Sequence, residues 1–290
     1  MLNMLKMDLY RMFCTRSMYV IWIVMAVVIV ATTALVKMDF DAINAENPAQ
    51  EEQLIEAGTE DVNVGINVEL PTQRGESITV FDVFYANSMS RFYALFLVIF
   101  AVIFSTADIN SGYIKNIGGQ VKNRGALIVS RAVALAVFTL ITMAGVFLLQ
   151  AVSNFIYFRE VEWGNLNAFL AYFFTESALH YALVLICMAI AVILKNNVIS
   201  MVISICITMN LMSLVYYLID RLIDKVGIHN FVISRYTVTG RIAMLGMEPG
   251  GRECLVSLAV AVIFGIVVTT LGSVIFRKKG YLKCILSLEY

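Results

Sequence analysis

The chain has 290 residues, of which 60% are hydrophobic and only 14% are charged, and its formal net charge is zero. Soluble domains carry roughly 25% charged residues, so this composition excludes an ordinary soluble domain and a disordered chain. The zero net charge, with no basic run longer than residues 277–279, argues against nucleic-acid binding. We therefore expect an all-α polytopic membrane protein.

Six segments are apolar and long enough, at about 20 residues, to cross the hydrocarbon core as helices. Four of them contain no charged residue or histidine, the second contains only Arg91, and the fourth contains Glu176 and His180. The predicted spans cover residues 18–36, 83–107, 132–158, 164–194, 196–219 and 254–276. An even number of spans places both termini on the same side.

The basic residues select the cytoplasmic side. Residues 1–17, 108–131, 195 and 277–290 together hold 12 of the 21 Lys and Arg residues but only three of the 21 acids. Segment 37–80 alone holds ten acids and two bases. We therefore expect the amino and carboxyl termini to lie in the cytoplasm.

The predicted spans contain no proline, because Pro48, Pro71 and Pro249 all lie in segments predicted to be external. Secondary transporters often build their central sites from a matched pair of helices interrupted by glycine or proline. We see no such pair in the two halves of this sequence, which argues against a secondary transporter.

The opening segment, residues 1–17, is predicted to form an amphipathic helix in the inner membrane interface. Its apolar residues recur at helical spacing, and its charged residues lie off that stripe. The apolar residues are Leu2, Leu5, Leu9, Met12 and Phe13, and the charged ones are Lys6, Asp8 and Arg11. The alternative is a short basic tail that only sets the topology.

Two longer segments are predicted to be external. In segment 37–82, Asn47 and Pro48 can start a short helix, and the strict alternation over residues 62–70 predicts one strand of a small hairpin. The simplest interpretation of its acidic residues is that they form a solvated surface. The alternative is that they admit or repel charged cargo. Segment 220–253 is too polar to span and too apolar for a free linker, so we expect short helices that dip into the outer leaflet.

The first predicted cytoplasmic loop, residues 108–131, is compact, and its short helical piece carries apolar side chains that could fill a partner's groove. At these residues the chain resembles the permease subunit of ABC-2 type transporters, the type 2 ABC exporters. The shared pattern is an acid, a glycine a few residues later, an Ile-Lys-Asn piece and an arginine before the third span. The residues that carry it are Asp108, Gly112, Ile114, Lys115, Asn116 and Arg124.

The resemblance also covers the layout, since segment 5–11 resembles the family's amphipathic elbow helix. The sequence departs from the family pattern at three places. Asp108 stands where many members have Glu, Arg131 stands where Lys is frequent, and the insertion at 37–80 is larger than in minimal members. These departures bear on which subfamily the chain resembles, and so on its cargo, more than on the class of transporter.

The resemblance implies that two permease subunits, identical or paralogous, form one path, and that two cytosolic ABC ATPase subunits bind below them. It also implies that the first loop docks on the ATPase, the alternative being that its charges only mark the inner interface. The implied coupling residues are Asp108, Gly112, Tyr113, Ile114, Lys115, Asn116, Ile117 and Arg124. The sequence contains no Gly-x-x-x-x-Gly-Lys-Ser/Thr phosphate-binding loop. ATP and Mg²⁺ would therefore be bound by the partner, and we expect no cofactor in this chain.

Polar groups inside the spans are candidates for a cargo path. Glu176 and His180 lie one turn apart on the fourth span, and ionisable residues inside a membrane are functional candidates by default. A mutually satisfied structural pair is the alternative reading. The candidate path residues are Glu176, His180, Ser200, Ser204, Thr208 and Asn210, although helix packing is the simpler use of the small hydroxyl residues. We expect no metal site, because Glu176 and His180 give two ligands without an evident third.

The sequence therefore predicts a permease subunit of an ABC exporter in a bacterial cell membrane, surrounded by lipid and without enzymatic activity of its own. A drug, a lantibiotic or another antimicrobial peptide is the expected cargo. The alternatives are a proton-coupled secondary transporter that uses Glu176 and His180, and a non-transporting membrane sensor or scaffold.

Overall fold

The computed structural model describes residues 2–45, 71–72, 77–110, 125–159, 161–209, 211–225 and 232–286. Every element in these ranges is a helix, which confirms the predicted all-helical class for this part of the chain. In chain order they are α1 (Leu2–Cys14), α2 (Arg16–Ala45), α4 (Val80–Met89), α5 (Phe92–Asn110), α7 (Gly125–Phe158), α8 (Leu166–Leu194), α9 (Asn197–Thr208), α10 (Leu211–Lys225), the short helix η1 (Ile233–Tyr236), α11 (Val238–Met244) and α12 (Gly251–Leu286).

Four of these helices, α2, α7, α8 and α12, are each long and apolar enough to cross a membrane. The number rises to six when two bent helix pairs are each taken as one span. These pairs are α4 with α5, bent by 54°, and α9 with α10, bent by 64°. The chain is therefore a multi-pass membrane protein with four to six candidate spans.

The sequence predicts no matched pair of helices interrupted by glycine or proline, and the two bends arise without either residue. Neither bent pair contains proline or glycine, so the usual signals for a break are absent. In α4–α5 the break falls at Ser90 and Arg91, where Arg91 adopts the left-handed conformation with φ of 64°. The Ser90 hydroxyl donates to the carbonyl of Ala86 at 2.8 Å, and such back-bonding bends helices.

Several helices extend beyond the predicted spans. α2 continues to Ala45, and Lys37 and Asp41 form an ion pair of 2.6 Å one turn apart on this extension, which stabilises the helix. α7 begins at Gly125, within the segment predicted to be a loop. The predicted external helix at Asn47 and the predicted strand over residues 62–70 lie outside the described residues.

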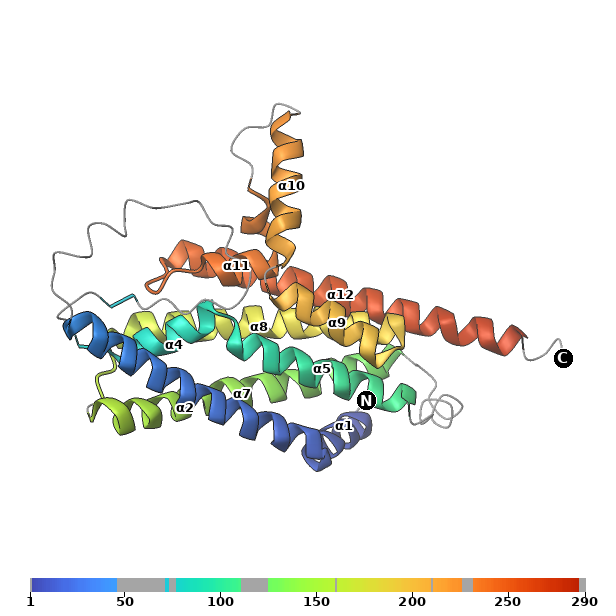
Figure 1. The fold of residues 1–290 in the computed structure, drawn as a ribbon. Helices are drawn as coiled ribbons and strands as arrows, with labels where there is room; N and C mark the ends of the chain where they lie inside the picture. The colour runs from blue at the N-terminus through green and yellow to red at the C-terminus, as the bar shows by residue number, and fades with distance from the viewer. Residues whose placement is uncertain are drawn as a thin grey trace.

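The bundle is organised around α8, which contacts α5, α7, α9, α11 and α12 (Figure 1). Aromatic side chains fill the space between α4 and α8. The ring centres of Phe81 and Phe169 lie 5.1 Å apart, and those of Tyr85 and Tyr172 lie 5.3 Å apart. Such pairs add packing energy beyond their buried area, so they fix α4 against α8.

Helix α10 stands apart from the bundle. α10 projects from the end of α9 across the long axis of the other helices (Figure 1), and none of its residues is buried. Its polar side faces the short helices that follow, because Asp220 accepts from the backbone N–H of Ile233 at 2.9 Å. The hydroxyl groups of Tyr216 and Thr239 lie 2.6 Å apart. η1 and α11 are short helices of the kind predicted for this segment.

The N-terminal helix α1 packs against α7 through a buried acid. Asp8 is 2% exposed, and its Oδ2 accepts a hydrogen bond of 2.5 Å from the Ser130 hydroxyl. The apolar stripe is only partly buried, since Met12 is fully buried while Leu2 is 70% exposed. The expectation that Asp8 lies off the packed face is therefore wrong. Asp8 is an anchor that fixes α1 near the beginning of α7.

We expect Asp8→Ala to loosen α1 without removing the chain from the membrane. The substitution leaves the buried Ser130 hydroxyl without this acceptor, a loss of about 1–3 kcal/mol. Hydrogen–deuterium exchange of the full chain in lipid nanodiscs should show faster exchange in residues 2–14. Lys6→Ala is the matched control, because Lys6 is exposed on the same helix. Equal exchange in the two variants would contradict the anchoring role of Asp8.

Candidate functional site

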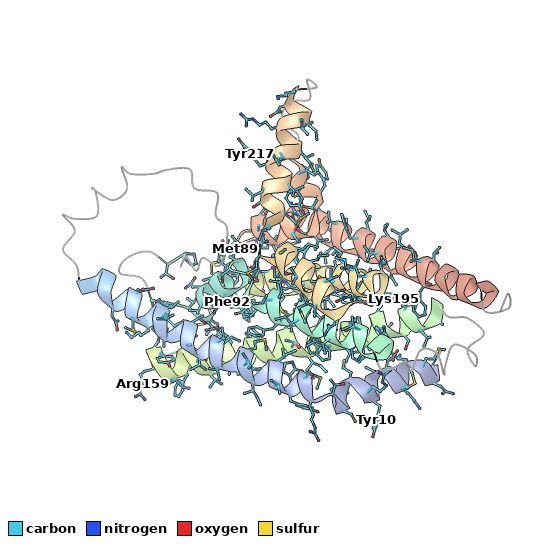
Figure 2. The ribbon with its side chains drawn as sticks, turned by 45° about the vertical axis from the view of Figure 1, so that its right-hand side comes forward. Tyr10, Met89, Phe92, Arg159, Lys195 and Tyr217 are labelled. Carbon is cyan, nitrogen blue, oxygen red and sulfur yellow. The ribbon has the colours of Figure 1, made fainter. Side chains whose placement is uncertain are left out.

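The candidate site is centred on the bend between α4 and α5, and the sequence around α4 fixes its position. α4 begins with a capping box, in which the Asp82 N–H donates to the Thr79 hydroxyl and the Asp82 carboxylate accepts from the Thr79 N–H. The helix ends ten residues later, at Met89. Figure 2 labels Met89 and Phe92 on either side of the bend. The intervening turn places Arg91 inside the protein, where it is 5% exposed.

Arg91 joins the first bent pair of helices to the segments that follow the second bend. Its Nη1 donates to the backbone carbonyl of Thr208 at 3.2 Å, and its Nη2 donates to the carbonyl of Thr239 at 3.1 Å. Thr208 is the last residue of α9, where carbonyl groups lack partners within the helix. The negative end of the helix dipole also stabilises the guanidinium. A charge in a membrane-spanning segment is thus held by backbone carbonyls from two other elements.

Glu176 and His180 lie beside this bend on α8, and both are fully buried. The Ser88 hydroxyl donates to Glu176 Oε1 at 3.2 Å. His180 Nδ1 lies 2.9 Å from the backbone carbonyl of Glu176 and 3.4 Å from its Oε1. Within the described part of the chain, Glu176 Oε2 and His180 Nε2 have no hydrogen-bond partner. The pair therefore retains an acceptor and a titratable nitrogen that the present arrangement does not use.

Arg91 and Glu176 are both buried beside the α4–α5 bend, where Arg91 is part of the bend and Glu176 is bonded to Ser88. They do not form a direct ion pair in this structure, because Arg91 donates to the two carbonyls and Glu176 accepts from Ser88. In a medium of low dielectric constant an uncompensated charge is costly. A negative charge on Glu176 would therefore lower the cost of burying the Arg91 guanidinium.

On its other side, α4 is connected to α2 and α7 by buried amides. Asn87 Nδ2 donates to Gln150 Oε1 at 3.2 Å. Gln150 Nε2 in turn donates to the Thr33 hydroxyl at 3.1 Å and to Asn154 Oδ1 at 3.0 Å. The neighbouring residues Asn87 and Ser88 thus connect the end of α4 to both sides of the bundle. We call the residues of this network and of the Arg91 cluster the polar layer: Thr33, Asn87, Ser88, Arg91, Gln150, Asn154, Glu176 and His180.

The structure brings some predicted path residues together and leaves others apart. Glu176 and His180 lie in the polar layer. Ser200, Ser204 and Thr208 form one buried face of α9, and only Thr208 contacts the layer, through its carbonyl. Asn210 lies outside the described residues.

The predicted coupling residues are not described. Asp108 falls within α5, but its side chain lies outside the description, as do Gly112, Tyr113, Ile114, Lys115, Asn116, Ile117 and Arg124. Their role remains a prediction from the resemblance.

Several members of the polar layer are absent from the predicted site. Arg91 is the only charge in the second predicted span, and a charge within a span is itself a signal for a functional position. Gln150 and Asn154 carry a weaker signal, since amides inside spans need hydrogen-bond partners. The contact with Thr239 has no sequence signal, because it uses a backbone carbonyl.

The site contains groups that can exchange hydrogen bonds or protons. Among the described residues, no three His, Cys, Asp or Glu side chains are close enough to hold a metal ion. A scan against protein-family models gives no match, and a search of curated proteins finds no significant match. The function is therefore argued from the sequence and the geometry.

Proposed function

We propose that this chain is the membrane-spanning permease subunit of an ABC-2 type exporter in a bacterial cell membrane. The observation that carries this proposal is the packing of the amphipathic helix α1 near the beginning of α7 through Asp8 and Ser130. This contact brings α1 to the end of the bundle at which α7 begins. Because the predicted coupling loop directly precedes α7 in the sequence, the proposal assigns it to the same membrane face as the elbow helix α1.

In this proposal each bent pair counts as one span, so the chain crosses the membrane six times with both termini in the cytoplasm. The Lys and Arg residues of segment 277–290 and of the first predicted cytoplasmic loop support this orientation. Two copies of the chain, or this chain and a paralogue, form the translocation path. Cytosolic ATPases that bind ATP and Mg²⁺ power transport from the cytoplasmic side. ATP-dependent closure of the motor would tilt the helical bundles between two states.

The cargo that fits best is an amphipathic molecule such as a drug, a lantibiotic or another antimicrobial peptide. The chain has 15 Met and 18 Phe residues, and soft side chains of these kinds adapt to varied apolar surfaces. Glu176 and His180 are enclosed within one chain in this structure. They would meet a cargo only in a state in which the helices around α8 separate.

A proton-coupled secondary transporter is the second candidate, and the two bends favour it. Secondary transporters place titratable groups beside interrupted helices near the middle of the membrane. Here Glu176 and His180 lie beside the α4–α5 bend, and the helices that bend are the second and fifth predicted spans. In this mechanism the pair would bind the coupling proton.

Purification of the tagged full chain from its own host, followed by reconstitution, tests the two candidates. We expect an ATPase subunit to co-purify and the proteoliposomes to show vanadate-sensitive hydrolysis that cargo stimulates. Transport that follows an imposed pH gradient in the absence of ATP would instead support the secondary transporter. No transport in either format would support a sensor or scaffold.

A further inference from the structure

The helices α10 and α11 and the short helix η1 form one connected unit, which we call the α10–α11 unit. The Asp220 carboxylate connects α10 to η1, and the hydroxyl groups of Tyr216 and Thr239 connect α10 to α11. η1 and α11 also pack closely, because a β-carbon on Gly240 would lie 2.1 Å from the backbone oxygen of Ser234. A displacement of α11 must therefore carry α10 with it.

The α10–α11 unit is held to the bundle by the packing of α11 against α8, and hydrogen bonds tie it on two further sides. On one side, Arg241 donates to the Ser257 hydroxyl at 2.6 Å and to the Glu253 carbonyl at 2.9 Å, and both acceptors lie on α12. On the other side, Arg91 donates to the Thr239 carbonyl. Arg91 therefore connects the first bend to the α10–α11 unit through a hydrogen bond.

The same guanidinium also holds the end of α9, the point from which α10 departs. Because its two amino groups bind the Thr208 and Thr239 carbonyls at the same time, one rigid fork connects the α9 side of the second bend to α11, and α11 contacts α10 through Thr239 and Tyr216. The backbone of Arg91 is itself at the first bend, in the left-handed region. One residue therefore determines the first bend with its main chain and contacts the second with its side chain.

We propose that Arg91 is a positioning residue that couples the two bent helix pairs, so that a change of angle between α4 and α5 is transmitted to the α10–α11 unit. Interfaces that have two discrete arrangements carry such coupling when a single contact spans them. The proposal concerns motion within this chain. It holds whether ATP or a proton gradient drives the transport cycle.

Hydrogen–deuterium exchange of the full chain in lipid nanodiscs tests the proposal with Arg91→Gln. Loss of charged hydrogen bonds to both carbonyls should accelerate exchange about tenfold or more at the end of α9 and in residues 233–244. The matched control is Arg131→Gln, a second buried arginine that donates to a backbone carbonyl, that of Ser105 at 3.0 Å. The control should leave both regions unchanged.

Two further variants separate the side chain from the backbone and from the charge. Arg91→Asn keeps a residue that tolerates the left-handed conformation but cannot reach the carbonyls, so it should behave like Arg91→Gln. Arg91→Lys keeps the positive charge, but its ammonium group replaces the two-armed guanidinium and can bind only one of the two carbonyls. It should therefore accelerate exchange at one of the two regions only. Native exchange at both regions in Arg91→Asn would overturn the proposal, as would acceleration confined to residues 85–95.

A distance measurement tests the transmission directly. Spin labels at Tyr217 on α10 and Phe155 on α7, both 56% exposed, report the position of the α10–α11 unit against the bundle. Figure 2 shows Tyr217 on the projecting helix. We expect one narrow distance distribution in the native chain and in Arg131→Gln, and a broad one in Arg91→Lys and Arg91→Asn. Equal widths in all four chains would overturn the coupling.

Discussion

Ile114→Asp should abolish cargo-stimulated ATP hydrolysis and transport while the chain remains in the membrane. In the proposed permease, Ile114 is part of the apolar face of the coupling loop that docks in a groove of the ATPase. A buried apolar contact of this size contributes about 1.5–3 kcal/mol, and an aspartate in the groove adds the cost of an unpaired charge. Both effects act on the contact between subunits, so we expect stimulated hydrolysis to fall at least about tenfold.

Leu282→Asp provides the control for this prediction, because it places the same new charge in the predicted cytoplasmic tail. Stimulated hydrolysis should stay native in that variant. Co-purification of the ATPase with each variant, followed by vanadate-sensitive hydrolysis in proteoliposomes, gives the measurement. If Ile114→Asp transports and hydrolyses like the native chain, the loop is not the coupling element.

The positions of the membrane helices could be predicted, because burial in lipid needs long apolar runs. The predicted spans 132–158 and 164–194 correspond to the single helices α7 and α8. Helix ends are harder to predict. The extension of α2 to Ala45 contains Lys37 and Asp41, and charged residues there are compatible with a helix that continues out of the membrane.

The bends could not be predicted from glycine or proline, because neither residue occurs in the two bent helix pairs. The first bend depends on the left-handed conformation of Arg91 and the hydroxyl of Ser90, and both residue types also occur in unbroken helices. A left-handed conformation at a residue with a β-carbon costs about 1–2 kcal/mol. It persists at Arg91 because the guanidinium reaches the Thr208 and Thr239 carbonyls. Tertiary contact therefore determines this backbone conformation, and the local sequence does not reveal it.

The site could be predicted in part, since an ionisable residue inside a span is informative without any structure. Glu176 and His180 are recognisable in that way, and the structure places Arg91 beside them. Helix periodicity assigns Asp8 to the outward face of α1, because charges on an amphipathic helix usually face water. The Ser130 hydroxyl that reverses this assignment lies far along the chain, and helix periodicity carries no information about such a partner.

Glu176→Lys should cause the largest loss of stability among single substitutions in the polar layer. It replaces the carboxylate that compensates Arg91 with a second buried cation and removes the acceptor for the Ser88 hydroxyl. Leaving a buried charge uncompensated costs about 3–5 kcal/mol. For a chain of this size that loss lowers the temperature of half-unfolding by about 10 °C. Size-exclusion chromatography of the detergent-solubilised chain after heating measures this temperature.

The charge interaction itself is isolated by a double-mutant cycle with Arg91→Met. If repulsion between the introduced lysine and Arg91 causes the loss, Arg91→Met should restore part of the stability of Glu176→Lys, with a coupling energy of about 0.5–3 kcal/mol. Asp224→Lys is the control for adding a lysine, because Asp224 is exposed near the end of α10, and surface changes stay within about 0.5 kcal/mol. Strictly additive losses in the double variant would show that Glu176 acts through Ser88 and His180 rather than through Arg91. The guanidinium would then be stabilised by the Thr208 and Thr239 carbonyls and the end of α9 alone.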